Sequence, residues 1–429
     1  MKPKRGIIKI KPVFIGIYHY EYSYGSVCSP DVRGTPHTPS LPEKELLKRA
    51  ENMVQEFKEN IRLDFVKVEE PFLVRKQSDL RTFSSKLTYD VDAILVGTLG
   101  CAPLELRTLR LYGIPLIGSR VSEEYLRALR VKKYLRESRF LYIGEIPSFS
   151  APNGPWDFYE IEKKLGIRAK HIDMSEFFRF FNSIPDSQAK RTLEEWRKDF
   201  AGVVEPSEEE LLDSAKIYLT LRYLCEKEDA NAVTINCGRF TEESAFYCNR
   251  PIVPCMAFNR LIDEGIMCAC EGDITATISA LILHAVSEQP VLMGNFGYRP
   301  GMFEAREDEV TIEHDIIPLS MATTKYRVRD YHGRKFGVTA YADIKKQQPI
   351  TLLNVDTSLE RMTVIEGWTK YSVDGGHCRI IIHIDVKGDV NKIPEILVGS
   401  QHISMTYGHW LKALVETGKL LGIEVLHFK

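Results

Sequence analysis

Two acidic residues flank one glycine between a short apolar run and a long one. They are Glu271 and Asp273, in the stretch "CACEGDITATISALILHAVSEQPVLMGN". Carboxylates can carry protons, cap a helix or bind a hard cation. The surrounding apolar pattern favours a strand over 266–270, a helix over 274–286 and a further strand directly after it. Strand, helix and strand in turn predict a βαβ unit of a parallel sheet.

The positions of the two acids predict different roles. Asp273 directly precedes the expected helix, where its carboxylate would accept from the free N–H groups of the first turn. Glu271 directly follows a strand, at the carboxyl end where open α/β sheets bind ligands, and capping does not need it. A right-handed crossover would bring Asn295, at the end of the next strand, to the same edge, and the strand "AVTIN" ends there at Asn236. We therefore expect Glu271, Asn295 and Asn236 to face one crevice.

Two histidines are candidates to complete this cluster. His314 lies in "TIEHDIIP", and His402 lies in "VGSQHISMTYGHW" just ahead of the last expected helix. Each by itself would more often be an ordinary hydrogen-bonded structural histidine. Oxygen and imidazole ligands with open positions suit manganese or magnesium better than a closed zinc site. The sequence contains no G-x-S-x-G elbow that would indicate a serine nucleophile.

The nine cysteines do not predict a disulfide framework or a zinc cluster. Their spacing is irregular and includes no C-x-x-C pair, and a chain of this size needs no disulfide staples, so we expect reduced thiols. Cys268 and Cys270 form a C-x-C that could bind a soft metal. The alternation in "IMCAC" favours buried strand residues instead.

Three regions follow from the pattern along the chain, at residues 1–135, 136–318 and 319–429. The first alternates helix-like segments with the apolar runs "VFIGIY", "LDFVKV", "AILVG" and "IPLIG", which predicts a parallel α/β domain. Its "GTLGCAPLELRTL" opens a helix after a strand, but matches neither the dinucleotide nor the P-loop spacing.

The second region is also expected to be α/β, and the third to be mostly antiparallel. The second opens with the strand "FLYIGEIPSF", and Ser207 and Glu210 have the spacing of a capping box. In the third, alternating strands include "RMTVIEGWTKYSV" and, after the turn "DGGH", "CRIIIHIDV". A helix over 409–421 and the strand "GIEVLHF" end the chain.

Composition excludes several classes of function. The 429 residues are 44% hydrophobic and carry a formal net charge of −2, without a basic cluster interleaved with aromatics, so we expect no nucleic-acid partner. No segment reaches about 18 apolar residues, and the N-terminus lacks the features of a signal peptide. We therefore expect a cytoplasmic, globular protein with no membrane partner, whose ligand is a small molecule.

Several segments together resemble the L-fucose isomerase and L-arabinose isomerase superfamily, particularly its shorter fucose-isomerase-like members. They are "PCMAFNRLIDEGI", "ACEGDITATISALILHAVSEQPVLMGN" and "GSQHISMTYGHWLKALVETGKLLGIEV". The likeness covers about residues 230–429, and the "CEGD" segment paired with the late "GSQH" segment is its most specific part. The N-terminal half agrees in its α/β pattern and in its order of domains.

The resemblance implies a fold and a chemistry. Members have two N-terminal α/β domains and a C-terminal domain with a β-barrel, and are commonly homo-oligomers with sites between subunits. They interconvert aldoses and ketoses with a divalent metal, usually manganese, held by two carboxylates and one or two histidines. Carried over, the first acid matches Glu271, the second position is Asn295, and the late histidine matches His402. His314 is a looser match to a further ligand.

The asparagine at position 295 departs from this pattern. An amide oxygen can bind a hard cation, but it brings no charge and cannot accept a proton as a carboxylate does. The expected function is a metal-dependent aldose–ketose isomerase in which Glu271 is the base, assisted by water or Asp273 if Asn295 is a ligand or a hydrogen-bond donor to the sugar. A sugar-binding or regulatory protein without turnover, a metal-dependent aldolase or epimerase, and an unrelated function such as nucleotide binding at "GTLG" remain alternatives.

Overall fold

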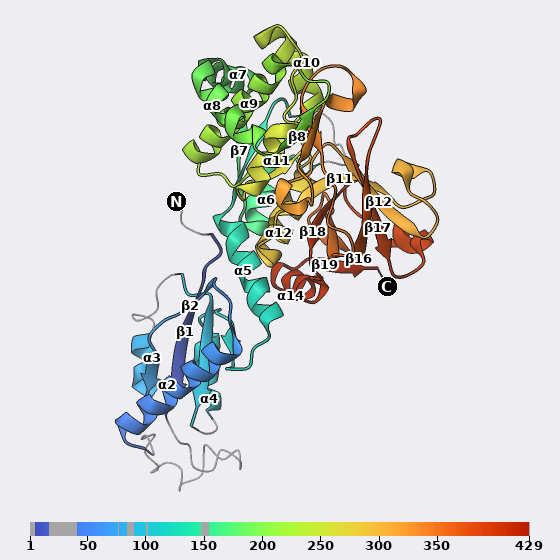
Figure 1. Cartoon of the computed structure of the whole chain (residues 1–429). Helices are drawn as coiled ribbons and strands as arrows, with labels where there is room; N and C mark the ends of the chain where they lie inside the picture. The colour runs from blue at the N-terminus through green and yellow to red at the C-terminus, as the bar shows by residue number, and fades with distance from the viewer. Residues whose placement is uncertain are drawn as a thin grey trace. The chain divides into compact units, whose positions relative to one another are not determined.

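The chain folds into two compact units, residues 1–133 and 134–429, and each is described here by itself. A computed structural model describes residues 5–16, 41–75, 77–83, 90–99, 102–146 and 154–428. The division falls inside one helix, α5 (Glu123–Glu137), which is drawn in teal in Figure 1.

The first unit is built on a parallel sheet, as the alternating strands and helices predict. Its strand order is β2-β1-β4-β5, and β3 pairs with β1 beyond the end of β2. Gly100 and Cys101 of the "GTLG" turn, and the end of "VFIGIY", lie outside the described residues. The elements are β1 (Ile8–Ile15), α2 (Glu43–Asn60), β2 (Val66–Val68), β3 (Phe72–Val74), α3 (Gln77–Phe83), β4 (Ala93–Thr98), α4 (Pro103–Arg110) and β5 (Leu116–Ile117).

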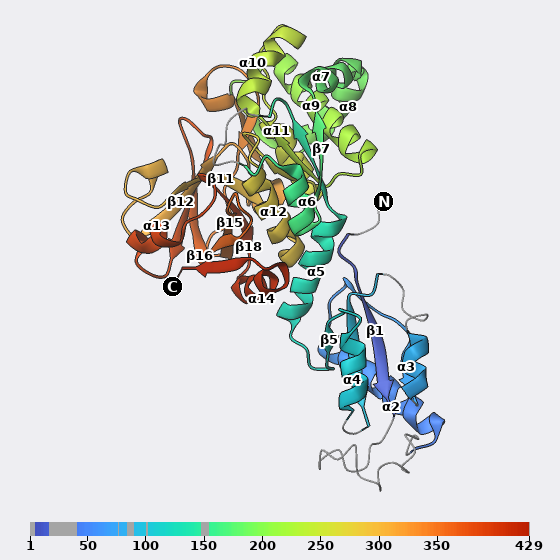
Figure 2. The ribbon, with the colours of Figure 1, turned by 180° about the vertical axis from the view of Figure 1, so that it is seen from behind.

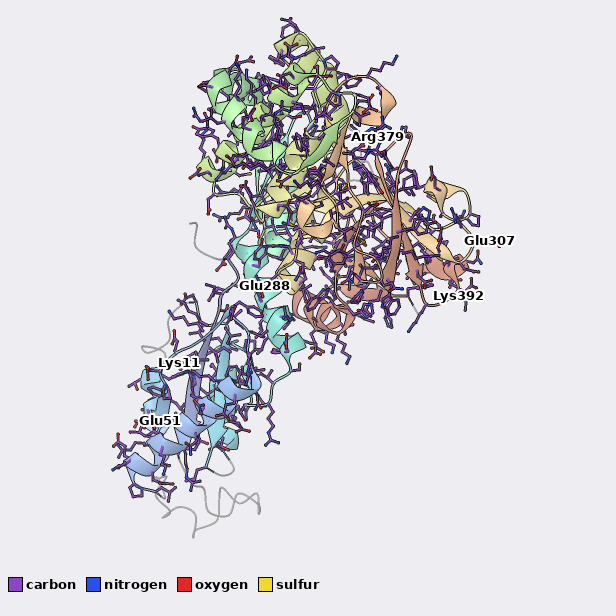
Figure 3. The ribbon with its side chains drawn as sticks, in the orientation of Figure 1. Lys11, Glu51, Glu288, Glu307, Arg379 and Lys392 are labelled. Atoms are coloured by element: carbon purple, nitrogen blue, oxygen red, sulfur yellow. The ribbon has the colours of Figure 1, made fainter. Side chains whose placement is uncertain are left out.

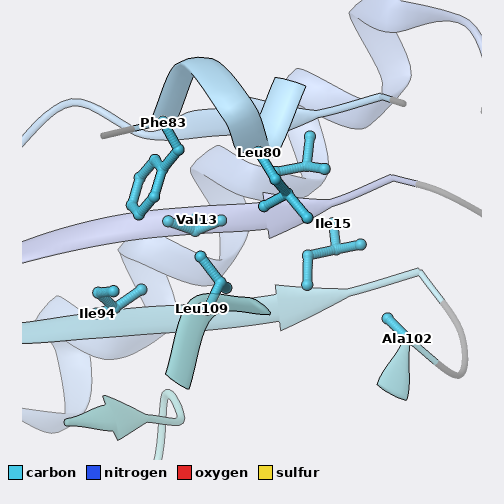
Figure 4. Close-up of a cluster of buried hydrophobic side chains, with 8 residues drawn as sticks. Val13, Ile15, Leu80, Phe83, Ile94, Ala102 and Leu109 are labelled. Carbon is cyan, nitrogen blue, oxygen red and sulfur yellow. The ribbon is translucent and has the colours of Figure 1, made fainter. Parts of the chain in front are cut away.

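A cluster of buried apolar side chains joins one face of this sheet to its helices. Val13 and Ile94 face it from the two central strands, β1 and β4, and Phe83 and Leu109 reach it from α3 and α4 (Figure 4). All four side chains are fully buried. Burial of such side chains contributes on the order of 1.5–3 kcal/mol each, so this face fixes how the two helices pack on the sheet.

The second unit begins with another parallel sheet, of strand order β10-β9-β6-β7. Helix α9 starts with the predicted capping box, because Ser207 and Glu210 each bond the backbone N–H of the other. The elements are β6 (Arg139–Ile143), α6 (Phe158–Leu165), β7 (Arg168–Ile172), α7 (Met174–Ser183), α8 (Asp186–Arg197), α9 (Glu208–Lys227), β9 (Ala232–Ile235), α10 (Cys237–Cys248), α11 (Cys255–Asp263), β10 (Met267–Ala269) and α12 (Ile274–Ser287).

A closed antiparallel barrel of six strands follows, in agreement with the expected fold class. The order is β15-β18-β11-β12-β17-β16, and β16 pairs with β15 to close the ring. Closure satisfies the backbone groups of both edges. The short strand β19 adds to β16 in parallel. The elements are β11 (Leu292–Gly297), β12 (Glu309–His314), β15 (Pro349–Val355), β16 (Arg361–Asp374), β17 (Ile380–Val386), β18 (His402–Tyr407) and β19 (Glu424–His427).

The prediction of a βαβ unit around the two acids is wrong for its last strand, which joins a different sheet. The strand of "VLMG" is β11, which pairs antiparallel with β12 and β18 in the barrel and does not lie in the parallel sheet of β10. Helix α12 is buried on all sides and packs between β10 and the barrel strands β15 and β18, where Figures 1 and 2 show it beside the barrel. An apolar helix therefore links two sheets, and hydrophobic periodicity does not specify which sheet the next strand joins.

The barrel thus begins before residue 319, since β11 and β12 precede it. Two strands expected in the third region form a separate small sheet of order β14-β13-β8. No helix in the described ranges is long and apolar enough to cross a membrane. The remaining elements are β8 (Phe200–Val203), η3 (Met302–Glu304), η4 (Leu319–Met321), β13 (Tyr326–Arg329), η5 (Tyr331–Gly333), β14 (Thr339–Tyr341), η6 (Val390–Lys392), α13 (Ile393–Ile396) and α14 (Leu411–Leu421).

Candidate functional site

A cavity of about 380 Å³ lies in the second unit, where the parallel sheet meets the barrel. Its volume is within the range of about 300–1,000 Å³ that is usual for small-ligand sites. Its walls come from the ends of β9 and β10, from barrel strands β11 and β12, and from the loops that contain η5 and the β16–β17 turn. The lining residues are Asn236, Cys237, Gly238, Thr241, Val253, Pro254, Cys255, Cys270, Glu271, Asn295, His314, Tyr331, His332, His377 and Cys378.

The "CEGD" segment forms a tight reversal between β10 and α12 that places Glu271 in this wall. Glu271 and Gly272 have φ angles of 60° and 64°, in the left-handed region. A Cβ atom on Gly272 would lie 2.7 Å from the hydroxyl of Tyr142, so the position requires glycine for both its angle and its space. Non-glycine residues in this region carry strain that is often found at functional sites, and Glu271 is such a residue.

Three of the predicted ligands converge. One ligand atom from each of Glu271, His314 and His402 lies within 4.8 Å of the other two. Nε2 of His402 is 3.7 Å from a carboxylate oxygen of Glu271, and the two imidazole rings meet edge to face with centroids 5.6 Å apart. The three residues come from the loop after β10, the end of β12 and the start of β18.

The orientation of His402 fits a metal ligand. Its Nδ1 lies 2.7 Å from Oδ2 of Asp273, and a carboxylate only accepts, so Nδ1 carries the proton and Nε2 presents its lone pair. Nε2 is buried and has no hydrogen-bond partner among the described residues, and the same holds for Nδ1 of His314. Buried nitrogen atoms without partners, beside a carboxylate, are the arrangement that a bound cation would satisfy.

The electrostatic environment shifts the pKa values of the two histidines in opposite directions. Burial, together with repulsion from His402 and His332, holds the pKa of His314 well below its usual value, so His314 is neutral. Burial also disfavours charge on His402, but the hydrogen bond that His402 donates to Asp273 and the charges of Asp273 and Glu271 outweigh it and raise the pKa of His402. A proton would therefore compete with any cation for Nε2 of His402.

The two predicted asparagines also line the cavity. Asn295 is directly opposite both His402 and Glu313 in the barrel register, and its Oδ1 is buried without a hydrogen-bond partner in the described part of the chain. Asn236 caps helix α10 by accepting from the N–H of Arg239 at 3.5 Å. Glu271 and Asn295 thus meet at one cavity as expected, although they come from different sheets.

The predicted cap at Asp273 is confirmed, since Oδ1 accepts from the N–H of Ala276 at 2.8 Å. Sequence reasoning missed the second contact of the same carboxylate. Oδ2 also accepts from the hydroxyl of Ser400 at 2.5 Å, besides its bond to His402. The side chain is fully buried, so Asp273 both starts α12 and orients a histidine of the barrel.

Sequence reasoning also missed four further residues that line the cavity, Tyr331, His332, His377 and Cys378. A weak signal was present, because a histidine and a cysteine are adjacent after the "DGG" turn, but His332 lies far from them in sequence. Cys270 lines the cavity rather than a strand interior, although it is buried as expected. The structure records free thiols at Cys237, Cys248, Cys255, Cys268, Cys270 and Cys378.

Comparisons with known proteins found a distant similarity. No protein-family model matches the chain. Sulfoquinovose isomerases of Priestia aryabhattai and of Priestia megaterium are each 21% identical to this chain over 312 residues. The match covers 70% of this chain and 66% of each relative, so it spans slightly less than two thirds of the relatives' length.

Proposed function

We propose that this protein is a metal-dependent isomerase that interconverts an aldose and a ketose by moving a proton between C1 and C2 through an enediol. The observation that carries the proposal is the convergence of Glu271, His314 and His402 at one cavity, with their ligand atoms within 4.8 Å of one another. Nε2 of His402 is buried and has no hydrogen-bond partner among the residues that the structure describes, which supports a cation at this point. Manganese or magnesium suits the carboxylate and imidazole donors.

Glu271 is the proposed base. Its carboxylate lines the cavity and its side chain is 45% exposed, so it can approach the carbons of a bound sugar. It removes the proton from C2 of the aldose and delivers it to C1, while the hydroxyl proton of O2 moves to O1, so the isomer forms with no net change in protons. Glu271, His314 and His402 would hold a divalent cation, whose positive charge would stabilise the negative charge that develops on the sugar oxygens.

The other residues of the site orient a ligand or bind the cation and the sugar. Asp273 keeps His402 in the tautomer that presents Nε2 to the cavity. The free Oδ1 of Asn295 is placed to bind the cation or to accept from a sugar hydroxyl, and Asn236 is a second candidate partner for the hydroxyls. Because an amide is not a base, Glu271 serves both carbons of the transfer.

The similarity to the sulfoquinovose isomerases supports an isomerase that acts on a sugar. The resemblance to fucose and arabinose isomerases, and with it a homo-oligomeric assembly, is part of the same proposal. The closed barrel agrees with the fold which that resemblance implies. Light scattering of the purified protein would measure the assembly state.

One observation favours a second candidate function, a sugar-binding or regulatory protein without turnover. Asn295 stands where the resemblance places an acid. An amide at this position lacks the negative charge that would attract a cation, and it cannot act as a base in the reaction. Such a protein would be stabilised by a sugar without forming product. An aldolase or epimerase would instead cleave the sugar or invert one carbon.

The deciding experiment is a panel of aldoses and ketoses incubated with the protein and manganese, with sulfoquinovose first and with deoxy and phosphorylated sugars beside it. Product analysis by NMR separates the isomer, the epimer and the cleavage products. We expect one aldose–ketose pair to reach equilibrium, and EDTA to stop the reaction. Stabilisation by a sugar with no product of any kind would favour the binding protein.

A further inference from the structure

A second group of side chains with metal-ligand chemistry lines the same cavity as Glu271. His332 comes from η5, and His377 and Cys378 come from the turn between β16 and β17. One ligand atom from each of the three lies within 4.8 Å of the other two. This group shares no residue with the cluster of Glu271, His314 and His402.

The distances within the group match those of a tetrahedral site. Sγ of Cys378 is 3.6 Å from Nε2 of His332 and 3.6 Å from Nδ1 of His377. With metal–sulfur bonds of about 2.3 Å and metal–nitrogen bonds of about 2.0–2.1 Å, a sulfur and a nitrogen ligand of a tetrahedral ion lie about 3.6 Å apart. The donors are therefore already spaced as a zinc ion would hold them.

A buried carboxylate adds negative charge beside these donors. Oδ2 of Asp315 lies 2.7 Å from Nε2 of His332 without hydrogen-bond geometry, and it has no hydrogen-bond partner among the described residues. Asp315 is fully buried, and its other oxygen accepts from the backbone N–H of Arg379 at 2.9 Å. The guanidinium of Arg379, labelled in Figure 3, binds Asp330 and the carbonyl of Gly375 instead. Oδ2 is thus a carboxylate oxygen in contact with one of the three donors.

The backbone and neighbouring rings hold His332 in place. Its φ is 52°, in the left-handed region, which is strained for a non-glycine residue. Its ring stacks on Tyr331 with centroids 3.8 Å apart, and its centroid lies 4.1 Å from that of the His377 ring. A strained residue fixed by stacking is already arranged for binding, before any ligand arrives.

We propose that His332, His377 and Cys378 form a second metal site that selects zinc-class ions, with the carboxylate of Asp315 beside His332. A thiolate and two imidazoles favour zinc or cobalt over manganese and magnesium, whereas the carboxylate and imidazoles around Glu271 favour the harder ions. Binding replaces the thiol proton of Cys378 by a sulfur–metal bond and releases that proton to solvent. One cavity therefore holds two sites with different metal preferences.

Cobalt(II) is the probe for this site, because cobalt–thiolate coordination gives a charge-transfer absorption in the near ultraviolet. Titration of cobalt into the metal-free, full-length protein should produce this band and saturate at one equivalent. C378S should abolish it. The matched control C237S removes another thiol of the same cavity and should retain it. No band at saturating cobalt, or a full band in C378S, overturns the proposal.

A second variant guards against misfolding of C378S. The side chain of His377 is 68% exposed, so H377A should fold normally while it weakens cobalt binding at least about tenfold. E271Q should keep the band at full strength, because Glu271 belongs to the other cluster. A wild-type protein that shows the cobalt band but no isomerisation would contradict the proposed function and leave the second site standing. A wild-type protein that isomerises a sugar but shows no cobalt band would contradict the second site alone. Unchanged cobalt affinity in H377A would contradict the ligand set.

Discussion

Asp273 and His402 are joined by a hydrogen bond of 2.7 Å across 129 residues of sequence. Both side chains are fully buried. The same carboxylate caps α12 through its other oxygen, so the helix start and the histidine orientation depend on one residue. The bond ties the loop after the parallel sheet to the first residue of the barrel strand β18.

Replacing Asp273 by asparagine should therefore impair metal binding more than folding. The amide oxygen can still cap α12, but an amide facing Nδ1 of His402 no longer selects the tautomer with a free Nε2. We expect manganese affinity to fall by about 10–100-fold, measured by calorimetric titration. D157N is the matched control, since Asp157 caps α6 away from the cavity. Equal manganese affinity in D273N and wild type would exclude this positioning role.

Glu271→Gln should abolish isomerisation and leave the fold intact. The amide keeps the volume of the side chain but loses its charge and its proton affinity, and the partly exposed position tolerates the change. Product formation and the melting temperature should be measured together. E242Q, at an exposed glutamate that pairs with Arg239, serves as the control. Wild-type turnover in E271Q would remove this residue from the mechanism.

Asn295→Asp should tighten manganese binding. The added charge lies opposite His402 in the barrel and attracts a cation. Without metal, the same charge lies near Glu271 and opposite Glu313, whose pKa is already raised by burial, and the melting temperature near neutral pH should fall. N236D places the same charge elsewhere on the cavity wall and should raise the affinity less. Weaker manganese binding in N295D would contradict a cation at this position.

Manganese affinity should decrease as the pH falls. Asp273 and Glu271 raise the pKa of His402, so protons displace the metal at a higher pH than for an ordinary histidine. In the metal-free protein, the raised pKa means that protonation of His402 favours the folded state. That contribution is complete below the unfolded value of about 6.5 and is lost as the pH rises through the folded value. The difference in melting temperature between wild type and H402Q should therefore shrink as the pH rises from 5 to 9. A difference that grows over this range would show that folding lowers the pKa of His402 and would contradict the prediction.

Manganese should raise the melting temperature, and EDTA should reverse the gain. A ligand that binds only the folded state stabilises it by about 2.7 kcal/mol at 100 times its dissociation constant. Differential scanning calorimetry at increasing manganese concentrations measures the effect. The shift should be absent in H402Q, which lacks the buried imidazole ligand. No shift in the wild type at millimolar manganese would count against the metal site.

The local features of the site were readable in the sequence. Alternating and helical periodicities depend on neighbouring residues, so the strand before "CEGD", the helix after it and the cap at Asp273 could all be predicted. The parallel sheets and the capping box at Ser207 followed from the same local rules. The resemblance to sugar isomerases supplied the barrel and singled out Glu271, His314 and His402.

The tertiary structure decided which sheet each strand joins and which distant side chains meet. Helix α12 is apolar on every side, so nothing in its pattern showed that the next strand would enter a barrel rather than the parallel sheet. The contact of Asp273 with His402 and the spacing of His332 against Cys378 depend on how separate strands and loops pack. Such pairings depend on burial and on closure of the barrel across the whole unit, so they cannot be predicted from the spacing of the residues in the sequence.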